Sequence, residues 1–346
     1  MAFSRKIIDW YKTNARTLPW RETRDPYIIW VSEIILQQTR VDQGLPYFKR
    51  FIESFPDVFS LASADEQEVM KLWQGLGYYS RARNLHASSK IIVDKFNGTF
   101  PSTYDSIRSL IGVGDYTASA ISSFCFDLPY AVLDGNVIRV ISRYAAVFEP
   151  VDTAKGFKIL KELSYSLLDK NKSAIYNQAM IEFGALQCVK SKPECSICPI
   201  KYQCKSYGSE LVKLLPYKQK KINVNKRVFN FLVFNFNETT YIHKIKEGIW
   251  KSLFQFPLIE GDINIKEINK SSFLKKIPKD DYSISEISET IIHKLSHQKI
   301  YAKFIKIDLK TSINIDFLIN INWNDIDQYP IPRLIDKYLK RNTTNR

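Results

Sequence analysis

The chain has 346 residues, of which 45% are hydrophobic and 13% aromatic, so it is long enough for two packed domains and is not expected to be disordered. Its net charge of +14 indicates a polyanionic partner, because Lys and Arg replace the counterions condensed on phosphates, although ribosomal and membrane-surface proteins carry similar charge. No apolar run approaches a membrane span, and residues 1–10 lack the apolar centre of a signal peptide. We therefore expect a cytoplasmic protein that does not bind membranes, nucleoid-associated if the source is bacterial. We also expect it to be a monomer.

The first 210 residues contain the start and stop signals of successive helices. Asp25 followed by Pro26 is typical of a helix N-terminus, because Asp caps free N–H groups and proline fits the first helical position. This helix should run to about Thr39, and Gly75 should end another after Trp73. Further helices are expected at 80–95, 115–127, 135–147, 155–170 and 173–187. Residues 1–210 are therefore predicted to form a helical domain.

One carboxylate lies within the apolar helix that begins near residue 26. At three and four positions from Glu33, its neighbours on the helix are Ile29, Trp30, Leu36 and Gln37. Desolvation disfavours the charged form of a carboxyl group, so Glu33 is a candidate general acid that holds a proton near neutral pH. The alternative is an ordinary surface glutamate on an amphipathic helix.

A glycine hairpin precedes a second carboxylate. Gly112, Val113 and Gly114 stand before the predicted helix 115–127, where a tight turn exposes backbone N–H groups that suit a phosphate. Asp134 is expected at the N-terminus of the next helix, where free N–H groups favour its ionised form. An acid at Glu33 and an anion at Asp134 are the pair that cleaves sugar bonds, whereas a simple N-cap is the alternative for Asp134.

Four of the five cysteines lie close together near the end of the helical region. Cys188, Cys195, Cys198 and Cys204 are separated by six, two and five residues. In a reducing cytoplasm such a group indicates a metal site rather than disulfides. A tetrathiolate zinc ion is one possibility, although zinc sites usually pair two short knuckles, and an iron–sulfur cluster is the other.

The character of the sequence changes after this cysteine group. Residues 211–227 contain six basic and no acidic residues and are predicted to be a basic linker, exposed or crossing a phosphate surface. Segments 228–234, 240–244 and 300–309 have the β-branched and aromatic residues of strands. Residues 228–346 are therefore predicted to form a second, α+β domain.

Together, these motifs resemble the helix-hairpin-helix, iron–sulfur DNA glycosylases, and among them the adenine DNA glycosylases of the MutY type. The resemblance spans most of residues 1–205 and rests on 18–21, 30–40, 75–85, the hairpin with Asp134, 176–180 and the cysteine spacing, which matches the family's [4Fe–4S] loop at 188–204. It implies a mostly α fold, in which a six-helix barrel and a helical domain with one [4Fe–4S] cluster precede a Nudix-like domain that recognises 8-oxoguanine. The implied partner is double-stranded DNA with mismatched or oxidised base pairs.

The resemblance also implies roles for individual residues. Glu33 would protonate adenine and help to activate water, Asp134 would stabilise the sugar cation, and Tyr116 and Asn136 would support them. The residues around the extruded adenine would be Arg16, Trp20, Arg21, Leu36 and Glu182. The residues that fill the gap or contact the opposing purine would be Gln38, Thr39, Leu76 and Tyr78, with Ser296 and His297 in the second domain. Gly112, Val113 and Gly114 would contact the DNA backbone, and Cys188, Cys195, Cys198 and Cys204 would hold the cluster.

Tyr116 distinguishes hydrolytic from lyase-type members of this group. Relatives such as endonuclease III carry a Schiff-base lysine at the second position after the hairpin, which is Tyr116 here. We therefore predict a monofunctional glycosylase that removes adenine mispaired with 8-oxoguanine or guanine. The alternatives are a related glycosylase for thymine in G·T mismatches or for oxidised pyrimidines, and a non-catalytic iron–sulfur DNA-binding protein. Next to Ser296 and His297, Leu295 stands at the position where members of this family commonly carry Phe.

Overall fold

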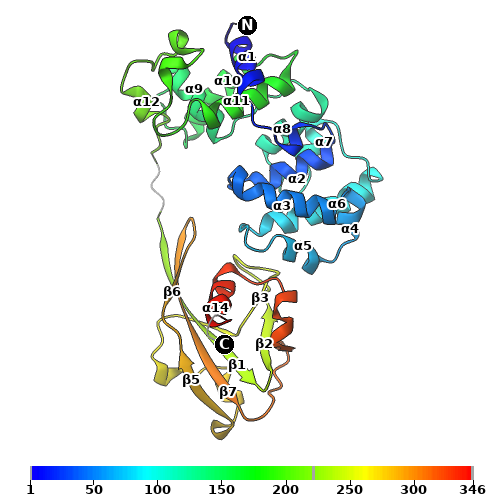
Figure 1. Ribbon diagram of the computed structural model, residues 1–346, viewed down its shortest axis with the longest axis vertical. Coiled ribbons are helices and arrows are strands. Elements are labelled where there is room, and N and C mark those ends of the chain that lie inside the picture. Colours follow the sequence, from blue (N-terminus) through cyan, green and yellow to red (C-terminus); the bar gives the residue numbers. More distant parts are fainter. Residues whose placement is uncertain (1, 220–222, 344–346) are drawn as a thin grey trace. The chain divides into compact units, whose positions relative to one another are not determined.

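The computed structural model describes residues 2–219 and 223–343, which divide into two compact units. Of the described residues, the first unit comprises 2–63 and 84–219, and the second comprises 64–83 and 223–343. The first is helical, and the strands of the described chain all belong to the second (Figure 1). Residues 64–83, which we expected within the helical domain, thus group with the sheet.

The helical unit follows the predicted helices closely. Its helices are α1 (Ala2–Asn14), α2 (Pro26–Leu36), α3 (Val41–Ser54), α4 (Val58–Ser63), α6 (Ser80–Phe96, from residue 84 onward), α7 (Tyr104–Arg108), α8 (Asp115–Phe126), α9 (Gly135–Ala145), α10 (Ala154–Leu167), α11 (Ser173–Leu186) and α12 (Leu211–Leu214). Short 3-10 turns occur at η1 (Pro19–Arg21), η2 (Cys195–Ile197) and η3 (Lys201–Gln203). Within the described ranges, none of the helices combines the length and the apolar character that crossing a membrane requires.

Helices α2 and α8 lie at the centre of the helical unit and pack against each other. Eight of the eleven residues of α2 are buried, because its sequence is apolar on all sides rather than on one stripe. The predicted cap is confirmed, since the Asp25 side chain accepts a hydrogen bond from the Tyr27 amide at 2.8 Å. The helix ends at Leu36, earlier than expected, and Gln38 has a left-handed backbone with φ of 58°.

The second unit is built on a mixed sheet whose two longest strands are parallel. Its strands are β1 (Asn225–Phe236), β2 (Thr239–Lys244), β3 (Phe254–Gln255), β4 (Leu258–Glu260), β5 (Tyr282–Ile287), β6 (Ile291–Lys294), β7 (Gln298–Leu309) and β8 (Ile319–Asn322). The main strand order is β3-β2-β1-β7-β5, with β4 on β1, β6 on β7 and β8 on β2. Only the β1–β7 pairing is parallel among these described strands.

Both faces of this sheet carry a hydrophobic core. Helical elements of the unit are α5 (Glu66–Leu72), α13 (Ile265–Ile268), η4 (Leu274–Lys276), η5 (Lys279–Asp281), η6 (Trp323–Gln328) and α14 (Arg333–Thr343). On one face Tyr338 of α14 stacks on Phe304 with ring centroids 3.9 Å apart, as the position of α14 in Figure 1 illustrates. On the other face Leu232, Ile305 and Ile307 pack with residues of α13 and η4. The sheet domain is therefore a substantial structure of its own.

The segment predicted as a basic linker is partly ordered. It contains α12, and β1 begins at Asn225 rather than at 228. The backbone carbonyl of Tyr217 accepts a hydrogen bond from Val151, and the Gln219 amide donates to Asp152. The segment up to residue 219 therefore lies against the helical unit, while residues 220–222 of the predicted linker lie outside the described residues.

Candidate active site

A cleft of about 570 Å³ opens in the helical unit beside α2 and α8. Its walls come from segments far apart in the chain. The sequence-predicted residues that line it are Arg16, Trp20, Arg21, Glu33, Leu36, Gln38, Thr39, Tyr116, Asp134 and Asn136. Such a concave site with several convergent polar groups has the size and character of a ligand pocket. The catalytic residues predicted from sequence are therefore brought together in one place.

Glu33 lies at the inner wall of this cleft and is buried. Burial raises its pKa to about 7, and the negative charge of Asp134 acts in the same direction. The hydroxyl of Tyr116 donates a hydrogen bond to the carboxylate, which opposes this rise without cancelling it. The Tyr116 hydroxyl itself has a raised pKa because it is desolvated and adjoins two carboxylates, so it acts as a donor.

Asp134 forms the N-cap of α9, as predicted. Its carboxylate accepts hydrogen bonds from the backbone amides of Asn136 and Val137, at 3.0 and 2.7 Å, and from the Asn136 side chain at 2.8 Å. We expected these donors to tune Asp134 opposite to Glu33, and this expectation is wrong. Burial outweighs the donors and raises the pKa of Asp134 above its ordinary value. The two carboxylates differ in hydrogen bonding rather than in the direction of their shifts.

Arg139 also lines the cleft, although the sequence alone did not indicate it. Its guanidinium donates to the side-chain oxygen of Asn136 at 2.9 Å and to the backbone carbonyl of Cys188 at 2.8 Å. Asn136 in turn donates to Asp134, so Arg139 holds the amide that orients this carboxylate. The i, i+3 spacing of Asn136 and Arg139 on one helix was a signal that could have identified it.

Glu182 of α11 is fully buried and forms ion pairs with Arg16 and Arg21, which line the cleft. Arg16 donates to it twice at 2.8 Å, and Arg21 donates at 2.7 Å. Although burial alone raises the pKa of Glu182, the hydrogen bonds from the two arginines bring it down to about 2. Glu182 is therefore an anion whose charge is matched by two guanidinium groups, and it fixes both of them at the cleft.

The predicted glycine hairpin lies between α7 and α8. Gly112 has φ of 80°, and a Cβ there would meet the Asn84 side chain at 2.7 Å, so glycine is required at this position. Gly114 is different, because its backbone is extended and its surroundings are open. Gly114 is the N-cap of α8 without a side-chain cap, and Val113 is buried. The exposed helix N-terminus has the geometry that suits a phosphate.

Residues predicted to contact the opposing purine lie in both units. Gln38 and Thr39 line the cleft of the helical unit. In the second unit, Tyr78 is 48% exposed with φ of 49°, and its hydroxyl is hydrogen-bonded to Ser296. His297 is exposed beside Ser296, whereas Leu76 is buried and faces the interior. Two of the segments predicted to contact the opposing purine, far apart in sequence, therefore meet within the second unit.

The four clustered cysteines line one small cavity of the helical unit, of about 30 Å³. None of them forms a disulfide, and Arg143 donates to the Cys188 sulfur at 3.4 Å. Over residues 2–219 and 223–343, no group of three Cys, His, Asp or Glu side chains has the arrangement of a metal-ion site. Four free thiols around one cavity beside a guanidinium nevertheless supply the donor set of a tetrathiolate-held group. Cys125 is buried elsewhere, on α8.

Comparisons with known proteins agree with this geometry. Residues 31–163 match the family described as "HhH-GPD superfamily base excision DNA repair protein". The adenine DNA glycosylase of Buchnera aphidicola subsp. Baizongia pistaciae is 37% identical, with 99% of this chain and 98% of that protein covered. The adenine DNA glycosylase of Rattus norvegicus is 39% identical over 60% of this chain and 42% of that protein. A solved thermostable thymine-DNA glycosylase is 29% identical with a TM-score of 0.55, covering 59% of this chain and 94% of that one.

The hairpin between α7 and α8, the carboxylate-lined cleft and the family match define a base excision DNA repair protein of the HhH-GPD superfamily. The class is thus a helix-hairpin-helix glycosylase that binds DNA. Since the similarity to the Buchnera protein extends over both units, this chain belongs to the adenine DNA glycosylase family.

The raised pKa of Glu33 predicts a pH-dependent stability difference. A carboxyl with a pKa near 7 when folded and 4.5 when unfolded binds its proton more tightly in the folded state. This group therefore opposes folding increasingly as the pH rises from 4.5 to 7. Glu33→Gln stays neutral, so its advantage in unfolding free energy over wild type should grow by about 2 kcal/mol between pH 5 and pH 8. Urea unfolding at both pH values measures this difference.

The control for this prediction is Glu53→Gln, which neutralises an exposed carboxylate on α3. Its stability difference from wild type should be the same at both pH values. Parallel pH curves for wild type and Glu33→Gln would contradict the assignment of a desolvated, proton-holding Glu33.

Proposed function

We propose that this protein hydrolyses the N-glycosidic bond of adenine mispaired with 8-oxoguanine or guanine in duplex DNA. The observation that carries the proposal is the buried Glu33, with a pKa of about 7, in a cleft shared with Asp134. One carboxyl group can donate a proton to the leaving base while the other faces the sugar. The choice of adenine as the excised base is inferred from the similarity to adenine DNA glycosylases.

In the first step, the Glu33 carboxyl would deliver its proton to N7 of the extruded adenine. A pKa of about 7 keeps a large fraction of Glu33 protonated at neutral pH and still allows the proton to leave. Protonation turns adenine into a better leaving group, so the glycosidic bond can break with positive charge developing on the sugar. Tyr116 keeps the carboxylate oriented after it has lost its proton, and the same carboxylate can then accept a proton from the attacking water.

Asp134 would stabilise the positive charge on the sugar. Its carboxylate is held by the Asn136 and Val137 amides and by the Asn136 side chain, so it cannot swing away as charge develops. Arg139 fixes Asn136 from the other side. A preorganised anion of this kind needs no rearrangement during the reaction, which is why it lowers the barrier.

The remaining cleft residues would bind the extruded nucleotide. Trp20 is buried against Phe48, with ring centroids 5.0 Å apart, and supplies an aromatic wall together with Leu36. Arg16 and Arg21 are held rigid by Glu182, so their remaining N–H groups point in defined directions. Extruding a base costs a few kcal/mol of unstacking, and such fixed contacts offset that cost.

Gly112, Val113 and Gly114 would hold the phosphate backbone at the N-terminus of α8. Gln38, Thr39 and Tyr78 would fill the gap left by the extruded base, and Ser296 and His297 would read the opposing 8-oxoguanine. The positive φ angles of Gln38 and Tyr78 support this proposal, because strained non-glycine backbone is concentrated at functional sites. The mixed sheet with α14 packed on one face is consistent with a Nudix-like domain. The buried Leu76 is better explained as support for the loop that carries Tyr78.

We also propose that Cys188, Cys195, Cys198 and Cys204 hold one [4Fe–4S] cluster. Their donor set and shared cavity support this, and a tetrathiolate zinc ion is the alternative. Such a cluster would cross-link the loop that carries Lys190, Lys192, Lys201 and Lys205. These four lysines would then contact DNA phosphates from a loop that the cluster holds rigid. The proposed setting is the cytoplasm, with the protein acting as a monomer and nucleoid-associated in a bacterium.

The excision activity can be tested with four duplexes that contain A opposite 8-oxoguanine, A opposite G, T opposite G, or an oxidised pyrimidine. Free adenine should be released from the first two. Glu33→Gln should reduce the single-turnover rate by at least ~100-fold, because it removes the general acid. The wild-type rate should fall as the pH rises above about 7, where Glu33 loses its proton. Full activity of Glu33→Gln, or release of thymine alone, would refute the assignment.

Tyr116 predicts how the reaction ends. Because the position of the Schiff-base lysine holds a phenol, the product should be an abasic site in an intact strand. Strand breakage should appear only after alkali treatment, and borohydride should trap no covalent complex. A lyase-type endonuclease III on its own substrate serves as the positive control. Rapid breakage without alkali would contradict the hydrolytic mechanism.

The cluster proposal predicts four irons per chain and visible absorbance in protein purified without oxygen. Cys198→Ser should lower the iron content and the unfolding temperature, since the loop loses its cross-link. Cys125→Ala is the matched control, because this fifth cysteine lies outside the cavity, and it should keep the full iron content. One zinc per chain without iron would favour the alternative site.

A further inference from the structure

One face of the sheet in the second unit carries an uncompensated group of lysines, which we call the lysine face. It consists of Lys226 on β1, Lys294 on β6, and Lys299, Tyr301 and Lys303 on β7. In the register of the sheet, Lys299 lies opposite both Lys226 and Lys294. Residues opposite each other in paired strands point to the same side, and alternate residues of one strand do so too. The five side chains therefore share one face.

The lysines converge on the tyrosine. The ammonium groups of Lys226 and Lys299 each lie 5.0 Å from the centroid of the Tyr301 ring. A hydrogen bond from Lys299 and the charges of Lys299, Lys226 and Lys294 lower the pKa of the Tyr301 hydroxyl. The face thus combines clustered positive charge with an aromatic ring.

No carboxylate neutralises this charge within the described chain. Ion pairs elsewhere in the second unit join Arg227 to Glu260 and Lys244 to Glu66, but none involves the four lysines of this face. Like charges directly opposite each other on paired strands repel and destabilise the sheet. A polyanion that binds here would remove this repulsion, and clustered Lys side chains suit a nucleic acid backbone because they replace the counterions condensed on its phosphates.

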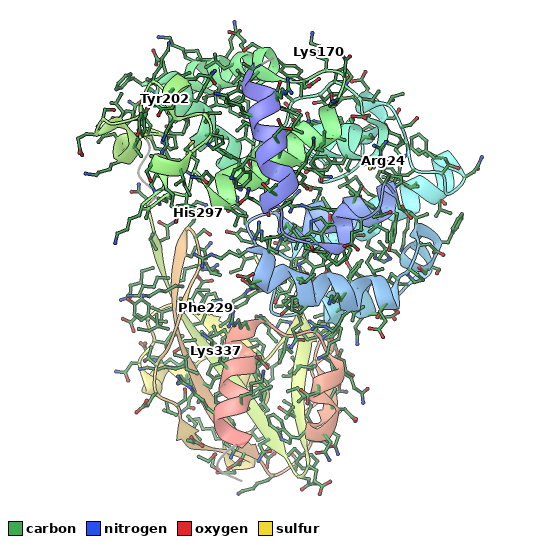
Figure 2. All side chains as sticks on the ribbon, turned by 45° about the horizontal axis from the view of Figure 1, so that its top comes forward. Arg24, Lys170, Tyr202, Phe229, His297 and Lys337 are labelled. Atoms are coloured by element: carbon green, nitrogen blue, oxygen red, sulfur yellow. The ribbon has the colours of Figure 1, made fainter. Side chains whose placement is uncertain are left out.

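The lysine face continues directly into the proposed recognition loop. Lys294 ends β6, residues 295–297 form the turn, and β7 starts at Gln298, so the loop connects the two strands that carry most of the face. Figure 2 labels His297 at the end of this hairpin. The Asn225 amide donates to the His297 carbonyl at 2.9 Å, which joins the start of β1 to the same loop. Exposed Ile292 lies opposite Tyr301 on the same face.

We propose that the lysine face binds the phosphate backbone of duplex DNA next to the base pair that the 295–297 loop contacts. The proposal rests on the proposed function, since it extends the DNA contacts of the same enzyme. Lys226 and Lys299 bind phosphates as point charges, with Tyr301 fixing their positions. These contacts are independent of base identity, so they contribute affinity and orientation, while Ser296 and His297 contact the base.

The test uses the full-length protein with Lys226→Gln and Lys299→Gln combined. Binding is measured by fluorescence anisotropy on a duplex that contains a non-hydrolysable adenosine analogue opposite either 8-oxoguanine or guanine, over a series of salt concentrations. Each lost phosphate contact reduces the slope of log affinity against log salt by about one. The double variant should therefore lower the slope by about two and weaken binding ~10-fold on both duplexes equally.

Two variants serve as controls. Lys279→Gln with Lys310→Gln removes the same charge from the opposite end of β7, near Asp281, and should leave both slope and affinity close to wild type. Ser296→Ala should weaken binding to the 8-oxoguanine duplex selectively and leave the salt slope unchanged. Thermal unfolding of every variant checks that the sheet is intact, which is expected because the substituted lysines lie at the surface.

The outcomes separate this proposal from the proposed function. An unchanged slope and affinity for the Lys226 and Lys299 variant would overturn the proposal, and would leave an acidic protein surface as the occupant of this face. A loss confined to the 8-oxoguanine duplex would also overturn it, because phosphate contacts do not distinguish the opposing base. Failure of the proposed function appears differently, as an absence of adenine release by the wild-type protein whatever its binding.

Discussion

The removal of Glu33 from water is the constraint on which the rest of the catalytic unit depends. A carboxyl group on an ordinary surface helix is ionised at neutral pH and has no proton to donate. Here α2 is apolar on all sides and packs against α8, so Glu33 is desolvated between them. Tyr116 comes from α8 and contacts the same carboxyl group. The packing of two helices thus generates the acid and its hydrogen-bond donor together.

The three acidic side chains Glu33, Asp134 and Glu182 differ in the hydrogen bonds and charges around them. Glu182 is an anion because Arg16 and Arg21 both donate hydrogen bonds to it. For Glu33, burial outweighs the hydrogen bond from Tyr116 and the charge of Arg21, so its pKa stays raised. Asp134 differs from both, since three N–H donors hold its carboxylate but burial still raises its pKa. Three acidic groups around one cleft therefore differ in their readiness to hold a proton, and hydrogen bonding distinguishes them.

The helical unit also connects this chemistry to its cysteine loop. Arg139 donates both to Asn136 and to the Cys188 carbonyl, and Arg143 donates to the Cys188 sulfur. The second unit has a comparable connection between distant segments, because Tyr78 and Ser296 are hydrogen-bonded although 218 positions separate them. In both units, single side chains connect segments that are far apart in the sequence. The lysine face lies on β1 and on the strands β6 and β7 that flank the loop carrying Ser296.

The sequence by itself determined the features that depend on local interactions. Asp25 and Asp134 cap their helices because the groups they bond are two or three residues away, and Gly112 is identifiable because only glycine adopts its backbone freely. The apolar neighbours of Glu33 likewise lie within one helical turn, so its burial was predictable.

Tertiary structure alone decided the features that depend on burial and long-range contacts. The direction of the Asp134 shift follows from desolvation by distant elements, which outweighs the local cap that the sequence displays. Glu182 meets Arg16 and Arg21 across more than 160 positions, and the lysines of the second unit meet only through strand register. Residues 64–83 likewise join the sheet unit through contacts that no local pattern specifies. The physical reason is that hydrogen bonds within a turn are encoded by neighbouring residues, whereas desolvation and charge pairing depend on everything that packs around a group.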